Sequence, residues 1–145
     1  MEPLVILVRP QMGENIGAAA RAMLNFGLSQ IRLVDPRDGW PNTRAVAMAS
    51  GAAGRVLDRA CIFPTLADAM HDVTYAYATT ARGRDLMKPV LTPPAAMADA
   101  RTRQGQGMRV AFVFGPERSG LENDDIARVN AIVTVPVNPD FPSLN

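Results

Sequence analysis

The segment Phe112–Glu122, FVFGPERSGLE, changes character within one residue. It continues the apolar run Val110–Phe114 and passes at Gly115 into a short loop of glycine, proline, charged and hydroxyl residues. A continuous apolar run that is rich in β-branched and aromatic residues indicates a strand covered on both faces, as in a parallel sheet. A glycine directly after such a strand indicates that another group approaches the backbone closely. We therefore expect a buried parallel strand that delivers residues 115–122 to a binding site.

Similar apolar runs alternate with alanine-rich segments along the chain. The expected strands are Leu4–Val8, Ile31–Val34, Tyr75–Ala78, Val110–Phe114 and Ile132–Val135, with a weaker strand at Cys61–Phe63. The expected helices are Asn15–Phe26 ended by Gly27, Arg44–Ser50, Thr65–His71 capped by Thr65, Pro94–Arg103, and Asn123–Val129 capped by Asn123. This alternation predicts an α/β domain with a mostly parallel sheet flanked by helices. Residues 82–94 are expected to form a long irregular segment with a functional role.

The bulk composition is that of one folded domain. The chain has 145 residues, with 48% hydrophobic and 20% charged residues, which predicts a single domain over residues 1–145. A net charge of +1 gives no evidence for a nucleic-acid partner. Lys88 is the one lysine beside many arginines. Arginine suits phosphate contacts, but the base composition of the genome explains this usage equally well.

Several classes of site are excluded by the residues present. One cysteine and one histidine cannot form a disulfide or a metal site of the usual kind, so we expect no metal, and we expect Cys61 to be a small buried residue. No apolar run approaches the roughly 20 residues of a membrane-spanning helix. The N-terminal segment MEPLVILV has no basic residues before its apolar run, so it does not resemble a signal peptide. We therefore expect a cytoplasmic protein with no membrane association.

Special residues gather directly after the expected strands, where open parallel sheets bind their ligands. Residues 12–21, MGENIGAAAR, match neither a Walker loop nor a GxGxxG motif. Their glycines indicate either an anion site or a helix capped by Asn15, with Gly17 allowing close packing. Arg21 interrupts an alanine-lined surface and should have a carboxylate or phosphate partner. Glu117 and Arg118 could pair with each other, cap the next helix or serve a site.

Three segments together resemble the SpoU branch of the SPOUT superfamily, the RNA ribose 2′-O-methyltransferases. They are Asn15-x-Gly17-x-x-x-Arg21 with Asn25-Phe26-Gly27, then Phe114–Leu121, and then Val135–Pro139 leading to Ser143-Leu144-Asn145. The third motif and residues 79–84, TTARGR, are most similar to the TrmJ-like tRNA (cytidine/uridine-2′-O-)-methyltransferases. The resemblance covers essentially the whole chain.

The resemblance implies a fold, a cofactor and partners. It implies a C-terminal trefoil knot that holds S-adenosylmethionine, and a homodimer with the active site near the interface. It also implies methylation of a tRNA ribose at the first nucleotide of the anticodon loop. The printed chain stops at Asn145, inside the third motif. We therefore expect the C-terminal extension of the family to be absent and the knot to be incomplete.

Site residues carry over from the resemblance by motif position. The implied catalytic residues are Asn15, Arg21, Glu117, Ser143 and Asn145. The implied cofactor contacts are Thr79, Thr80, Ala81, Gly115, Val135, Pro142, Ser143 and Leu144. Arg82, Arg84 and Arg118 are expected to bind RNA. A guanidinium with a pKa of about 12 or more is a poor base, so we expect Arg21 to grip a phosphate and the ribose hydroxyl.

Three other functions remain open from the sequence. One is a generic nucleotide-binding α/β protein, which the missing phosphate-loop motifs disfavour. A SpoU-type enzyme could act on ribosomal RNA or on another tRNA position, and transfer to a tRNA that lacks its anticodon arm would distinguish these. A non-catalytic RNA- or cofactor-binding module could keep the same fold, but such a module has no need of the Asn15 and Arg21 pair.

Overall fold

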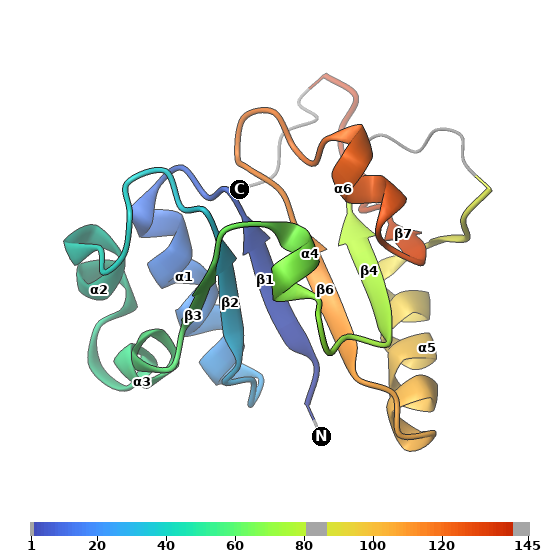
Figure 1. Ribbon diagram of the computed structural model, residues 1–145, viewed down its shortest axis with the longest axis horizontal. Helices are drawn as coiled ribbons and strands as arrows, with labels where there is room; N and C mark the ends of the chain where they lie inside the picture. The colour runs from blue at the N-terminus through green and yellow to red at the C-terminus, as the bar shows by residue number, and fades with distance from the viewer. Residues whose placement is uncertain (1, 81–86, 141–145) are drawn as a thin grey trace.

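A seven-stranded, wholly parallel sheet organises the computed structural model, which describes residues 2–80 and 87–140 (Figure 1). The strand order across the sheet is β3-β2-β1-β6-β4-β7-β5. The strands are β1 (Leu4–Val8), β2 (Ile31–Val34), β3 (Cys61–Phe63), β4 (Tyr75–Thr79), β5 (Val90–Leu91), β6 (Val110–Phe114) and β7 (Ala131–Val133). The predicted α/β class and the parallel sheet are therefore confirmed.

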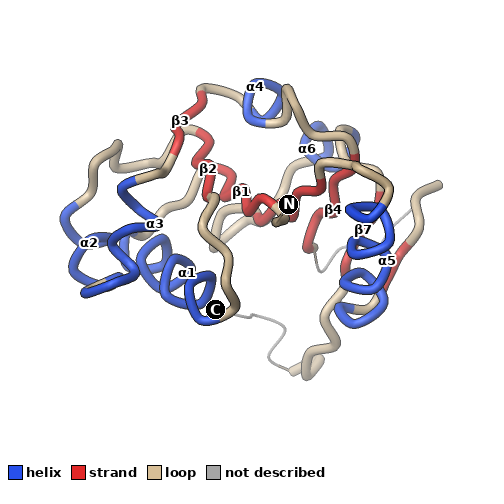
Figure 2. The backbone as a smooth tube through the Cα atoms, turned by 90° about the horizontal axis from the view of Figure 1, so that it is seen from below, coloured by secondary structure: helices blue, strands red, loops and turns tan. Residues whose placement is uncertain are grey.

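Helices cover both faces of the sheet (Figure 2). They are α1 (Gly13–Asn25), α2 (Thr43–Ala49), α3 (Gly54–Asp58), α4 (Leu66–Ala69), α5 (Pro93–Gly105) and α6 (Asn123–Ala127), with a 3₁₀ turn at Gly51–Ala53. The helices α1, α2, α3 and α5 lie on one face, and α4 and α6 lie on the other (Figure 2). On the first face, α1 and α5 stand apart, over opposite halves of the sheet.

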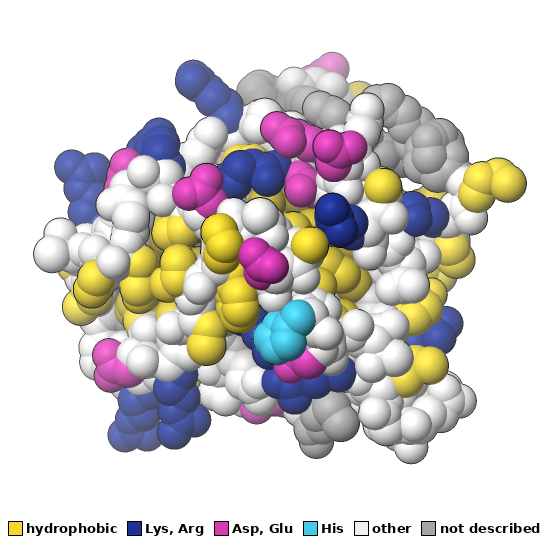
Figure 3. Space-filling view, in the orientation of Figure 1, with side chains coloured by type: hydrophobic (Ala, Val, Ile, Leu, Met, Phe, Trp, Pro, Cys, Tyr) yellow, Lys and Arg dark blue, Asp and Glu magenta, His cyan; other side chains and the backbone are white. Residues whose placement is uncertain are grey.

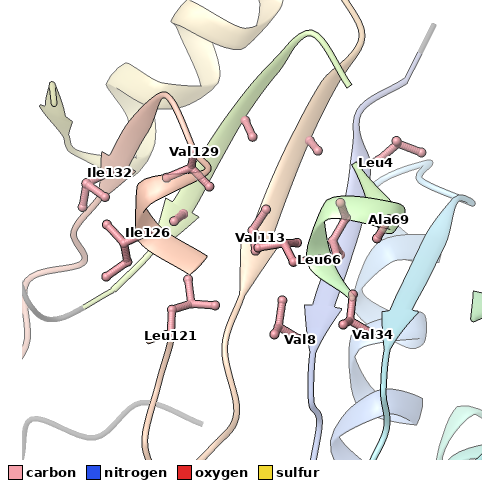
Figure 4. Packing of buried hydrophobic residues seen from close by; sticks show 14 residues of the cluster. Leu4, Val8, Val34, Leu66, Ala69, Val113, Leu121, Ile126, Val129 and Ile132 are labelled. Atoms are coloured by element: carbon pink, nitrogen blue, oxygen red, sulfur yellow. The ribbon is translucent and has the colours of Figure 1, made fainter. Parts of the chain in front are cut away.

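Alternating side chains of the strands supply cores on both faces. Leu4, Ile6 and Val8 of β1 face α4 and α6, in a cluster that Figure 4 shows with Val113. The intervening Val5 faces the other way, toward α1. Burying one such side chain contributes about 1.5–3 kcal/mol. The strands are thus apolar on both faces, which explains the continuous runs in the sequence.

Most expected strands are confirmed with small shifts. β1, β2, β3 and β6 have the predicted bounds, and β4 extends one residue further, to Thr79. The strand β7 begins at Ala131 and ends at Val133, before the prolines that follow, so the predicted end at Val135 is wrong. The segment 82–94 was predicted to be irregular, yet it contains β5 and the start of α5. Cys61 is exposed on the edge strand β3, so its predicted burial is wrong.

The predicted helices are present, but two caps differ. The N-cap of α1 is Met12, so Asn15 lies inside the first turn and is not the cap. The N-cap of α6 is Glu122, whose side chain forms a capping box with Asp125, so the assignment of Asn123 is wrong. Thr65 caps α4 as predicted, and Gly27 follows α1 with a φ of 75°, where glycine carries no steric penalty. The 3₁₀ turn and α3 were not predicted.

Two glycines allow α1 to pack closely against α2 and its cap. A Cβ atom on Gly17 would lie 2.3 Å from the carbonyl oxygen of Ala45. A Cβ atom on Gly13 would lie 2.2 Å from Oδ1 of Asn42, the residue that caps α2. The predicted close packing at Gly17 is therefore confirmed. This contact fixes the N-terminal half of α1 against α2.

Candidate functional site

A groove of about 940 Å³ opens between α1 and the carboxyl ends of the central strands. Its walls come from β1, α1, the ends of β4 and β6, and the segment after β7. Apolar side chains form most of the lining, including Phe114, which is 38% exposed, and Phe26, which is 82% exposed. Seven of the predicted site residues line this groove: Asn15, Thr79, Thr80, Gly115, Glu117, Arg118 and Val135.

The glycine after β6 is required by the loop itself. A Cβ atom on Gly115 would lie 2.5 Å from the backbone nitrogen of Leu121 and 2.7 Å from the carbonyl carbon of Gly120. The loop closes because the N–H of Gly120 donates to the carbonyl oxygen of Pro116 at 2.9 Å. Gly120 adopts a φ of 71°, which few other residues tolerate. The chain thus folds back on itself and presents residues 116–119 at the groove.

Glu117 joins this loop to the start of α1. Its carboxylate accepts hydrogen bonds from the backbone N–H groups of Gln11 and Met12, both at 2.8 Å, and from Nδ2 of Asn15 at 3.0 Å. Two of the interpretations above expected Glu117 to pair with Arg118 or to cap the next helix. The structure shows neither contact for Glu117. Glu117 connects segments 102 to 106 residues apart in the sequence.

The pKa of Glu117 lies below its usual value of 4.5. Burial alone would raise this pKa, but the hydrogen bonds from Met12, Gln11 and Asn15 stabilise the carboxylate and outweigh it. Glu117 is therefore ionised at neutral pH and is a weak proton acceptor. Its geometry suits a structural anchor for the groove rather than a general base.

The ends of β4 and β7 meet on the far side of the groove. Thr79 and Thr80 follow directly from β4, and the N–H of Thr80 donates to the carbonyl oxygen of Val133 at 3.2 Å. Val135 comes shortly after β7, half-buried, and lines the same groove. These residues are therefore brought together with Gly115, although the chain separates them widely.

Arg21 lies on a different side of α1 from the groove. It is exposed and lines a shallow depression of about 300 Å³ between α1 and α2, together with Glu14, Arg44, Ala47, Met48 and Ser50. Within residues 2–80 and 87–140, the side chain of Arg21 makes no hydrogen bond or ion pair. Asn15 and Arg21 thus face separate hollows of the same chain. Seven predicted site positions lie outside the described residues: Ala81, Arg82, Arg84, Pro142, Ser143, Leu144 and Asn145.

An ion pair next to the groove was missed by the sequence analysis. Nη2 of Arg9 donates to Oδ2 of Asp125 at 2.6 Å, and this bond raises the pKa of Arg9. Asp125 is buried and also accepts from the backbone N–H of Glu122. The pair ties the end of β1 to the start of α6, so the loop 115–122 is held at both ends. The signal in the sequence was Arg9, a charged residue directly after a buried strand.

Two further kinds of feature are absent from the part of the chain that the structure describes. Among the described residues, no group of histidine, cysteine or acidic residues could hold a metal ion. No described helix is both long and apolar enough to cross a membrane.

Comparison with known proteins identifies the family. The model of the SpoU rRNA methylase family matches residues 2–145. The chain belongs to the SpoU methylase family. It is 42% identical over its whole length to an uncharacterized tRNA/rRNA methyltransferase, LasT, of Escherichia coli strain K12, of which it covers 63%. It is 40% identical to the tRNA (cytidine/uridine/adenosine-2′-O-)-methyltransferase TrmJ of Pseudomonas aeruginosa, with 97% of this chain and 54% of that protein aligned.

A solved structure supports the same assignment for the SpoU methylase domain. The crystal structure of TrmJ from Z. mobilis ZM4 superimposes with a TM-score of 0.90 and 58% sequence identity. The alignment covers all of this chain and 63% of the Z. mobilis chain. The chain therefore spans between half and two thirds of the length of these relatives.

Proposed function

We propose that this chain is the catalytic domain of a cytoplasmic, S-adenosylmethionine-dependent enzyme that methylates a ribose 2′-hydroxyl of tRNA, at the first nucleotide of the anticodon loop. One observation carries the proposal. Asn15, Gly115, Glu117, Thr79 and Val135 come from separate segments and line one groove in a chain of the SpoU methylase family. The TrmJ relatives support tRNA as the substrate.

The groove suits a cofactor of this size and character. Its volume of about 940 Å³ lies within the range of small-molecule sites, and it lies beyond the carboxyl ends of parallel strands. Thr79, Thr80, Gly115 and Val135 would hold the cofactor there, with Ala81, Pro142, Ser143 and Leu144 as further proposed contacts. When bound, S-adenosylmethionine supplies a methyl group on a positively charged sulfur that is open to a nucleophile.

The residues of the chain bind and orient the reacting groups. Glu117 fixes the loop and Asn15 at one wall of the groove. The guanidinium of Arg21 binds a phosphate and stabilises the negative charge that develops on the 2′-oxygen. A phosphate oxygen or water accepts the hydroxyl proton. Ser143 and Asn145 complete the proposed catalytic set, and Arg82, Arg84 and Arg118 contact the RNA.

A homodimer would bring Arg21 to a groove. Arg21 does not line the groove of its own chain, while the wall of that groove exposes the apolar side chains of Phe26 and Phe114. Exposed apolar patches of this kind mark interaction surfaces. We infer a dimer in which Arg21 of the partner subunit serves the groove of the first.

The trefoil knot stays a proposal that the strand order supports. The last strand, β7, lies between β4 and β5, although both of these precede it in the chain. The chain therefore leaves β7 beside the carboxyl end of β4, where the connection from β4 to β5 also starts. Passage of the tail through that connection would form the knot.

Methyl transfer to two tRNA transcripts tests the function. One transcript is unmodified, and the other carries a single deoxyribose at the first nucleotide of the anticodon loop. We expect transfer to the first and none to the second, because the second lacks the attacking oxygen. Equal transfer to both would contradict the proposed position. Transfer to a tRNA without its anticodon arm, or to ribosomal RNA only, would support the alternative SpoU-type substrates.

A further inference from the structure

The depression between α1 and α2 has a charge pattern that the proposed chemistry does not fully use. Arg21 and Arg44 line it on either side, Glu14 lies beside Arg44, and Ala47 and Met48 provide apolar surface. Two guanidinium groups and one carboxylate leave a net positive charge there. Figure 3 shows basic side chains at the end of the molecule that α2 and α3 form.

The backbone makes this arrangement rigid. The close contact at Gly17 holds α1 against α2, with Ala45 and Met48 as the neighbours. Glu14 and Arg21 are seven residues apart, which is about two helical turns, so they share one side of α1. Arg44 lies in the first turn of α2, next to the cap Asn42. The two arginines therefore lie along the same depression, each on a helix that is packed against the other. Their side chains are the parts that can move.

The contacts within the protein leave these guanidinium groups available. Nη1 of Arg44 lies 3.9 Å from Oε2 of Glu14, and the Arg44 side chain is 76% exposed. An exposed pair of this kind contributes about 0–1 kcal/mol, so a ligand can displace it at little cost. Arg32 differs, because it is buried and donates two hydrogen bonds to Asp72.

Helix stability does not account for Arg44. The helix dipole favours carboxylates in a first turn and disfavours a guanidinium there. The first turn of α2 contains no acidic residue.

We propose that the depression binds RNA backbone phosphates, with Arg44 holding a phosphodiester that neighbours the one bound by Arg21. The inference rests on the proposed function and extends its RNA track from α1 onto α2. A planar guanidinium matches a phosphate with two parallel hydrogen bonds, and such contacts position RNA without reading its sequence. Ala47 and Met48 offer apolar surface to a sugar or base beside that phosphate. Glu14 competes with the phosphate for Arg44, and it orients the Arg44 side chain before RNA binds.

The test measures tRNA affinity by fluorescence anisotropy over a series of salt concentrations. For Arg44→Ala we expect affinity about three- to tenfold weaker at low salt, and a salt dependence of log K that is shallower by about 0.7–0.9. For Glu14→Gln we expect binding about two- to threefold tighter, because the competing carboxylate charge is removed. The opposite directions of these two changes are the signature of a phosphate at this depression.

Arg101→Ala is the matched control. Arg101 is an exposed arginine on α5, at the other end of the sheet from α2 (Figure 1). We expect the tRNA affinity of Arg101→Ala, and its dependence on salt, to match those of the unaltered chain. Circular dichroism of each variant confirms that it is folded, which the exposure of Arg44 makes the expected result.

Three outcomes would overturn the inference, and they differ in what they say of the function. In the first outcome, the unaltered chain binds and methylates tRNA, and Arg44→Ala binds tRNA as tightly as the Arg101→Ala control. This result would refute the Arg44 site alone. No RNA binding by the unaltered chain would refute both the site and the proposed function. A changed oligomeric state of Arg44→Ala, with unchanged RNA affinity, would assign the depression to a protein contact.

Discussion

The two sides of α1 differ in how completely the protein satisfies its own polar groups. On the groove side, Glu117 accepts three hydrogen bonds, and the loop after Gly115 is closed by backbone contacts. On the α2 side, Arg21 has no described partner, and Arg44 has one distant ion pair. The contrast is between a groove wall held by hydrogen bonds within the protein and a charged depression whose arginines are available for the proposed RNA phosphates.

The largest expected effect is the loss of methyl transfer when Arg21 in the depression is replaced. Arg21→Ala should lower methyl transfer more than about a hundredfold, as the loss of one group that stabilises developing charge does. The affinity for S-adenosylmethionine should change less than about twofold, because the proposed partners of Arg21 are the RNA phosphate and the ribose oxygen and not the cofactor. Transfer assays and calorimetry measure the two quantities. Retained transfer would contradict the role of Arg21, and loss of cofactor affinity would contradict the separation of the two sides.

A mixed dimer tests whether the two sides come from different subunits. At a cofactor concentration too low to fill the weakened groove of Gly115→Ala, neither Arg21→Ala nor Gly115→Ala should be active alone. Random mixing of the two chains should restore about a quarter of the wild-type activity, because half of the dimers carry one intact pairing of groove and arginine. Refolding the variants together and separately, followed by the transfer assay, measures this. No recovery on mixing would place Arg21 and the groove of the same chain at one active site.

The next effect probes the fixed shape of the groove. Gly115→Ala places a Cβ atom 2.5 Å from the backbone of Leu121, so the loop must shift. We expect the free energy of unfolding to fall by about 1–3 kcal/mol, with weakened cofactor binding. Gly54→Ala is the control, since Gly54 has open space and a φ of −57°. Its stability should be unchanged or higher by up to about 1 kcal/mol. Equal denaturation midpoints for the two variants would refute the steric argument.

The smallest effect concerns the charge of Glu117. Glu117→Gln should lower the free energy of unfolding near neutral pH, because an NH₂ donor replaces one of the two accepting carboxylate oxygens. The site is partly exposed, so we expect a loss of about 1 kcal/mol. The folded pKa is depressed, so the contribution of Glu117 is fully present above its usual value of 4.5 and is lost as the pH falls through the folded pKa. Denaturation from neutral pH down to pH 3 should therefore show the two proteins converging. A constant difference across this range would contradict the charge-based role.

The sequence predicted the architecture because its strands are apolar on both faces. Runs such as Leu4–Val8 and Val110–Phe114 are too continuous for a half-exposed strand, and the structure buries nearly all of them. The strand β5 was missed because Val90–Leu91 is too short to show a pattern between prolines. The anchoring of Glu117 to Gln11 and Met12 was also out of reach, because a carboxylate that caps a distant segment leaves no local signal.

Helical geometry could have placed Arg21 correctly. Six residues separate it from Asn15, and six residues turn a helix through about 600°. The two side chains therefore point in different directions, whereas the sequence analysis grouped them into one site. A sequence motif does not tell which of these two hollows each residue lines, and the shared role of Asn15 and Arg21 stays a prediction.

The position of β7 also constrains how the chain assembles. Among the described strands, β5 pairs only with β7, and β7 pairs with β4, whose residues are synthesised more than 50 positions earlier. One edge of β4 thus stays unpaired, and β5 unattached, until the last described strand has left the ribosome. Such distant pairing slows folding and leaves an edge open to wrong association in the meantime. Nascent chains arrested before residue 131 should therefore lack hydrogen-exchange protection at β5 while β1 and β2 are already protected.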